Sequence, residues 1–185
     1  MTAKTFMIRC NLEEIQYLAD KGNVDAQFNL GSIYYNGDGV EKDYGKAYEC
    51  FKKVADQGYA IAQSILGAMY NNGEGVNQDY EKAVKWFEKA AEQGYAGAQV
   101  NLGVMYCEGK GVRKDYEKAR ELYEKAAEKG DAGAQFNLAL IYYNGYGVMK
   151  DYEKAAELYE KAATQGNVKA LYNLILLYYN GYGLK

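Results

Sequence analysis

The chain has 185 residues, 49% of them hydrophobic, and a net charge of −3 from 22 basic and 25 acidic side chains. It contains no dense basic cluster and no apolar run long enough to span a membrane, so we expect neither nucleic acid nor membrane as a partner. The first ten residues lack the apolar stretch of a secretory signal, so we expect a cytoplasmic protein unless a signal has been removed.

The residues that usually hold metals are scarce. The chain has no histidine, and Cys10, Cys50 and Cys107 do not show the spacing of metal ligands. We therefore expect three unpaired thiols, no metal site and no cofactor. A nucleophilic mechanism also has little to use, because neither serine begins a Ser-x-x-Lys motif.

Several residues recur at steps of 36 residues along the whole chain. Ala26, Leu30 and Tyr34 repeat in this way, and so do two glycines of a G-x-G turn that begin as Gly37 and Gly39. A fixed period of 20–50 residues indicates a repeat array, in which each unit packs mainly on its neighbours. The pattern predicts an all-α solenoid of tandem helix-turn-helix repeats, with residues 1–185 as a single domain.

In chain order, the predicted array begins with half a repeat and ends with part of one. Residues 1–24 are expected to form an N-terminal cap, because NLEEIQYLADK resembles the second helix of the later units. The full repeats are expected at 25–60, 61–96, 97–132 and 133–168, and a partial repeat at 169–185.

Each full repeat is predicted to contain two helices. In the first repeat these cover roughly residues 25–36 and 44–57. The first helix should end at a left-handed glycine such as Gly37, and the second should begin after the N-cap Asp43. A small residue in the first helix, namely Gly31, Gly67, Gly103 or Ala139, predicts close contact between helices.

The last predicted helix, ALYNLILLYYNG, departs from this pattern. Leu171 replaces the glutamine of the earlier units, and Ile175 replaces the small residue. Two interpretations stay open at this stage. Ile175 fills the space of a missing second helix, or the apolar helix seeks a partner in a second copy of the chain or in a removed segment.

These motifs resemble the Sel-one-like repeat family, a relative of the tetratricopeptide repeat. The matching elements are A-x-x-x-L-G-x-x-Y, G-x-G-V, D-Y-x-K-A and K-A-A-x-x-G, and together they extend over residues 11–184. The resemblance implies a right-handed α-α superhelix that acts as a non-enzymatic scaffold or adaptor for protein–protein interactions. It implies no reaction.

In tetratricopeptide-like solenoids the first helices line a concave groove, and here their variable positions are the candidate binding site. An asparagine amide donates and accepts hydrogen bonds, which suits an extended peptide, while aromatic residues supply pockets. The predicted partner is thus a protein or extended peptide. The candidate residues are Phe28, Asn29, Ser32, Tyr35, Val100, Asn101, Val104, Phe136, Asn137, Leu140, Tyr143, Tyr172, Asn173, Leu176 and Tyr179.

Three alternatives accompany this hypothesis. The asparagine and aromatic positions can instead serve packing between helices. Some secreted, cysteine-rich members of the family have been labelled β-lactamase-like, but this chain does not place its cysteines in pairs within each repeat. Finally, the high similarity between units also fits a fragment or an engineered array without a native partner.

Overall fold

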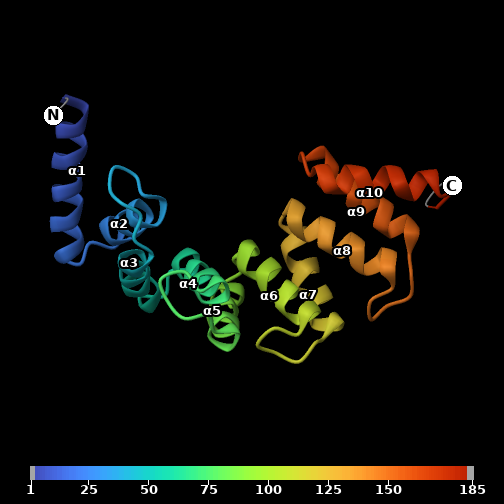
Figure 1. Ribbon diagram of the computed structural model, residues 1–185. Coiled ribbons are helices and arrows are strands. Elements are labelled where there is room, and N and C mark those ends of the chain that lie inside the picture. Colours follow the sequence, from blue (N-terminus) through green and yellow to red (C-terminus); the bar gives the residue numbers. More distant parts are fainter. Residues whose placement is uncertain (1–2, 183–185) are drawn as a thin grey trace. The chain divides into compact units, whose positions relative to one another are not determined.

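The computed structural model describes residues 3–182, with side chains from residue 12 onward. This part of the chain contains helices only, and Figure 1 labels them in sequence order. Their bounds are α1 Ala3–Asp20, α2 Val24–Asn36, α3 Tyr44–Asp56, α4 Ala60–Asn72, α5 Tyr80–Glu92, α6 Ala96–Glu108, α7 Tyr116–Glu128, α8 Ala132–Asn144, α9 Tyr152–Thr164 and α10 Val168–Tyr179. The predicted all-α fold of tandem helix pairs is confirmed.

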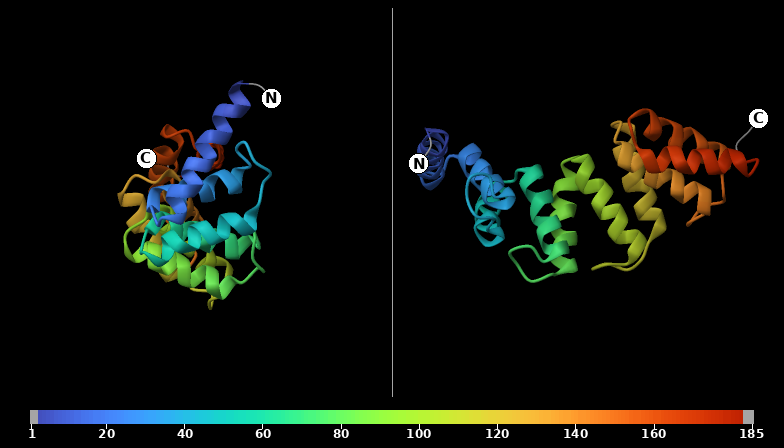
Figure 2. Two further views of the ribbon diagram at one scale, coloured as in Figure 1. Left: turned by 90° about the vertical axis from the view of Figure 1, so that its left-hand side faces the viewer. Right: turned by 45° about the horizontal axis from the view of Figure 1, so that its top comes forward.

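The helices form two compact units, which divide between Ala90 and Ala91 near the end of α5. Within the first unit α1 packs on α2, α2 on α3 and α3 on α4. Within the second unit α6 packs on α7, α7 on α8, α8 on α9 and α9 on α10. Consecutive helices thus pack on each other within each unit, and the right-hand view of Figure 2 shows α8, α9 and α10, coloured orange to red, close together at the C-terminal end.

The helix ends follow from the residues that the sequence repeats. Gly37, Gly73, Gly109 and Gly145 all adopt left-handed φ angles of 71° to 80°. At the first of these, the Gly37 N–H donates to the Ile33 carbonyl at 2.8 Å and so ends the helix. At the next helix start, the Asp43 carboxylate accepts from the Lys46 backbone N–H at 2.9 Å. Asp79, Asp115 and Asp151 accept in the same way, which confirms the predicted caps.

The second glycine of the turn lets neighbouring repeats approach each other. A Cβ added at Gly75 would lie only 2.2 Å from the Tyr44 carbonyl oxygen in the preceding repeat. Any side chain would therefore force the turn away from the start of α3. Gly75 also has a φ of 71°, which an L-residue rarely adopts.

The small residue of each first helix lies against an aromatic ring of the following helix. A Cβ at Gly31 would meet the Phe51 ring at 2.9 Å, and a Cβ at Gly103 would meet the Tyr123 ring at 2.5 Å. The equivalent Ala139 is completely buried. The predicted close contact is confirmed, and it joins the two helices of one repeat.

A buried glutamine connects each first helix to the second helix of the preceding repeat. Within the first unit, the Gln27 side chain donates to the Ala19 carbonyl at 3.1 Å, and Gln63 donates to Ala55 at 3.2 Å. In the second unit Gln99 donates to the Ala91 carbonyl at 3.3 Å. These amides add a second hydrogen bond to carbonyl groups near the ends of the preceding helices, which also accept from the backbone N–H groups of Gly22, Gly58 and Gly94.

Helix α1 packs directly on α2. Ala19, near the end of α1, is buried together with Ala26 and Leu30 of α2, and Ile15 packs beside them. Leu18, in the last turn of α1, is 39% exposed. Helix α1 therefore packs on α2 as the second helix α3 packs on α4.

Candidate partner-binding surface

The two kinds of helix in the second unit differ sharply in charge. The first helices α6 and α8 read AGAQVNLGVMYCE and AGAQFNLALIYYN, with Glu108 as their single charged residue. The second helices α7 and α9 read YEKARELYEKAAE and YEKAAELYEKAAT. Apart from Glu108 at the end of α6, the accessible surface of these first helices is consequently uncharged and rich in amide and apolar groups. An uncharged surface of this kind suits a protein partner, because charged residues are depleted where interfaces are most buried.

The asparagines predicted to bind a peptide fall into two groups. Asn29 and Asn101 are exposed, whereas Asn137 and Asn173 are half-buried. The Asn173 side chain donates to the Tyr159 hydroxyl at 3.4 Å and so connects α10 to α9. Asn173 thus has a packing contact, while Asn29 and Asn101 present their amides to solvent.

The predicted aromatic positions lie at the boundary between surface and core. In the first unit Phe28 and Tyr35 both contact the Phe51 ring, at centroid distances of 5.5 Å and 6.3 Å. In the second unit Phe136 packs on Tyr159 and Tyr143 on Tyr152, at 5.9 Å and 5.6 Å. These four rings are half-buried against the second helix of their own repeat. They therefore serve packing, with one side of each ring still accessible.

The remaining predicted positions are half-buried in α2, α6 and α8 and exposed in α10. Ser32 is half-buried and donates to the Phe28 carbonyl of its own helix at 3.1 Å. Val100, Val104 and Leu140 pack against the core of the second unit. On α10, by contrast, Tyr172, Leu176 and Tyr179 are 63%, 38% and 86% exposed.

Burial keeps the reactive groups near these helices neutral. It raises the pKa of the Cys50 and Cys107 thiols, which are free, so neither is a thiolate at neutral pH. The Cys10 side chain lies outside the described residues. Burial, together with a 2.8 Å hydrogen bond to Glu74, raises the pKa of Tyr35 to about 12. Among the described side chains, no cluster of three metal-ligating groups is present.

A polar depression of about 450 Å³ between α7, α8 and α9 was not predicted from the sequence. Two glutamates and two lysines line it, so its charges balance. Glu124 accepts hydrogen bonds from Arg120 and Tyr142, at 2.8 Å and 3.2 Å. Because Glu124 is already engaged within the protein, we regard the depression as part of the structural framework.

None of the described helices is long and apolar enough to cross a membrane. The Sel1 repeat model matches four segments of the chain, at 24–59, 60–95, 96–131 and 132–167. Each segment starts one residue before the repeat expected from the sequence.

Solved structures show the same repeat. A protective antigen of uropathogenic Escherichia coli, which displays an SLR fold, is 43% identical with a TM-score of 0.89 over 94% of this chain and 37% of that one. A Sel1 repeat protein from Oxalobacter formigenes is 35% identical with a TM-score of 0.83, over 94% of this chain and 77% of that one.

One curated protein also matches. An uncharacterized Sel1-like repeat-containing protein of Schizosaccharomyces pombe is 56% identical over 34 residues, which is 18% of this chain and 5% of that protein. The chain thus spans only a small part of this relative and about a third of the Escherichia coli antigen.

Proposed function

Because the chain belongs to the Sel1 repeat family, whose members are generally scaffolds for protein interactions, we propose that it binds an extended protein segment on the first helices of its second unit, α6 and α8. Sel1 solenoids are typically non-catalytic, and the proposal gives no residue a catalytic role. The observation that carries the proposal is the uncharged, amide-bearing surface of α6 and α8, beside second helices that are densely charged.

The second unit offers the best-defined part of this surface. Its first helices α6 and α8 contact each other directly, so Asn101 and Asn137 occupy equivalent positions on adjoining helices. Val104 and Leu140, one turn further along, are half-buried and leave apolar surface beside the amides. Paired amides are suited to the alternating N–H and C=O groups of an extended chain, and the apolar surface would accept its side chains.

We expect the double variant Asn101→Ala/Asn137→Ala to weaken peptide binding roughly tenfold or more, because two hydrogen bonds are lost at about 1 kcal/mol each. The probes are peptides selected on the wild-type protein from a random library displayed on phage. Their affinities are then measured by fluorescence anisotropy.

The matched control is Glu121→Ala/Lys125→Ala, which removes two exposed side chains from the second helix α7. This control should bind the peptides as the wild type does, and circular dichroism should show equal helicity for all three proteins. Unchanged affinity in the asparagine variant, or an equal loss in the control, would contradict the proposed surface.

A further inference from the structure

The surface of α6 and α8 offers few hydrogen-bonding groups to a bound chain. The described part of the protein contains helices only, and their backbone groups are paired within the helices, so no sheet edge is available to a peptide. Side chains must therefore make the hydrogen bonds. The residues of this α6–α8 surface are Asn101, Val104, Phe136, Asn137, Leu140 and Tyr143.

The two asparagine amides of this surface are available to a ligand. Asn101 is exposed and Asn137 is half-buried, and neither has a hydrogen-bond partner within the described residues. Asn173 differs, because its amide donates to the Tyr159 hydroxyl at 3.4 Å. An amide both donates and accepts, so each free asparagine can pair with the backbone N–H and C=O groups of a single peptide residue.

The distance between the two helices selects the conformation of the peptide. Helices α6 and α8 contact each other, and packed helices lie about 8–10 Å apart. A polyproline II helix has three residues per turn and rises about 3.1 Å per residue, so it advances about 9.3 Å per turn. A segment in this conformation presents an equivalent residue to each asparagine, with two residues between them. A β-strand returns to the same face after about 6.6 Å or about 13 Å, and neither distance matches the helix spacing.

The space between the amides favours peptide residues that have no N–H group. Two of every three peptide residues would face no asparagine, and an N–H held against the protein without a partner costs free energy. The surface there is apolar, because Val104 and Leu140 are half-buried and the rings of Phe136 and Tyr143 are accessible on one side. Proline lacks the N–H, and aromatic-lined surfaces accept its ring.

We propose that the α6–α8 surface binds an uncharged, proline-rich segment in the polyproline II conformation, with the repeating pattern x-Pro-Pro. Residue x pairs with an asparagine amide, and the two prolines span the distance to the next helix. This inference rests on the proposed function and names the chemistry of the partner.

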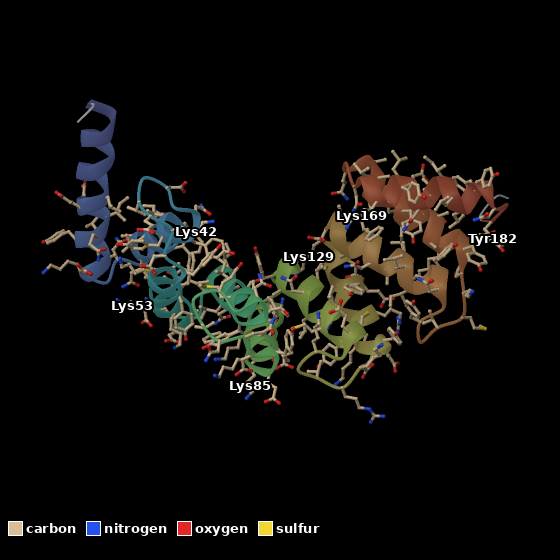
Figure 3. All side chains as sticks on the ribbon, in the orientation of Figure 1. Lys42, Lys53, Lys85, Lys129, Lys169 and Tyr182 are labelled. Carbon is tan, nitrogen blue, oxygen red and sulfur yellow. The ribbon has the colours of Figure 1, made fainter. Side chains whose placement is uncertain are left out.

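The distribution of charge supports an uncharged partner. Glu108, at the end of α6, is the single charged residue of α6 and α8, so a charged segment would find almost no counter-charge on these helices. Figure 3 labels Lys129 just beyond α7 and Lys169 at the start of α10, which precede and follow α8 and α9 in the chain. A proline-rich segment is also ordered before it binds, so it loses less conformational entropy than a flexible chain.

Selection from a random library of peptides displayed on phage tests the pattern. Sequences are retained when the wild type enriches them and Asn101→Ala/Asn137→Ala does not, so that they report on this surface. We expect pairs of prolines that recur every three residues. Apolar residues with a period of two would indicate a strand, and apolar residues three and four apart would indicate a helix. Either result would overturn the inference and leave the proposed function intact.

A selection in which no sequence distinguishes the two proteins has a different meaning. It would show that the asparagines do not contribute to binding, so the proposed function would fail, and this inference with it.

The affinity test compares two fluorescein-labelled peptides of the same composition. One repeats Ala-Pro-Pro four times, and the other has two alanines at each end of eight prolines. Both favour the polyproline II conformation, but only the first presents an N–H to both asparagines at once. Fluorescence anisotropy should show that the wild type binds the first peptide at least about tenfold more tightly, since two hydrogen bonds depend on the spacing.

Asn101→Ala/Asn137→Ala should remove this difference between the peptides. The matched control, Glu121→Ala/Lys125→Ala on α7, should retain it, and circular dichroism should show equal helicity for all three proteins. Equal affinity of the wild type for the two peptides would overturn the x-Pro-Pro pattern.

Discussion

Helices α8 and α10 occupy the same place in the repeat, yet they meet different surroundings. Both begin at a capped N-terminus, where Asp131 and Asn167 accept from backbone N–H groups at 2.7 Å and 3.0 Å. Both bury an alanine, Ala134 or Ala170, against the preceding second helix. They diverge on the other face, where α8 is covered by α9 and α10 is open.

The difference shows that the two faces of a first helix have separate requirements. The face toward the preceding repeat keeps its alanine even in the last helix. The face toward the helix's own partner changes, from Ala139 and Gln135 in α8 to Ile175 and Leu171 in α10. Small or amide residues are therefore required only where a second helix packs closely. The comparison can be tested by exchanging residues between the two helices.

The largest effect is expected from exchanging the small residue and the isoleucine. Ala139→Ile should lower the free energy of unfolding by about 1–3 kcal/mol, because the added atoms must enter a fully packed site. Ile175→Ala should change it by no more than about 0.5 kcal/mol, because that side chain is exposed. Urea unfolding at a low protein concentration measures both. Equal destabilisation by the two variants would show that the faces do not differ.

The helix ends and the packing inside each repeat were largely predictable from the sequence. The glycines, the aspartate caps and the small residues recur at fixed positions, and each serves a local backbone or packing requirement that acts within one repeat. The role of Gln27 and its copies was missed, although their recurrence at a buried position was a usable signal. An amide is equally compatible with surface and core until its partner is known.

The candidate site was harder to predict for a geometric reason. Residues such as Phe136 and Tyr143 lie on the side of the helix between core and solvent, so their variation indicated a binding surface. The structure shows both rings against α9. Helical periodicity determines which residues share a face, but it does not determine which neighbour covers that face. Among the predicted apolar and aromatic side chains, the most exposed are those of α10, which no second helix covers within the described residues.

The second prediction concerns Tyr159 of α9, whose ring contacts Phe136 of α8 and whose hydroxyl accepts a hydrogen bond from Asn173 of α10. Burial raises the pKa of Tyr159 to about 12, whereas a tyrosine in an unfolded chain has a pKa of about 10. Between these values the folded protein holds a proton that the unfolded chain has released, so stability falls as the pH rises from about 10 to about 12. Below pH 10 both states are protonated, and this contribution to stability is complete.

Urea unfolding at several alkaline pH values measures this dependence. Tyr159→Phe should reduce the fall in stability without abolishing it, because burial also raises the pKa of Tyr35, of Tyr48 and of Tyr123. At neutral pH the variant loses only the long hydrogen bond from Asn173. A phenylalanine variant with the same alkaline profile as the wild type would show that Tyr159 titrates normally in the folded protein.

The smallest effect is expected at the glutamine position. In Gln135→Leu the Gln165 side chain loses its acceptor, so stability should fall by about 1 kcal/mol or less, since Gln165 is exposed and water can replace the bond. The reverse exchange, Leu171→Gln, should leave the free energy of unfolding of this chain nearly unchanged, because the Leu171 side chain is 49% exposed. A Leu171→Gln protein that unfolds much more readily than the wild type would show that the two positions have the same packing requirement, contrary to their different exposure.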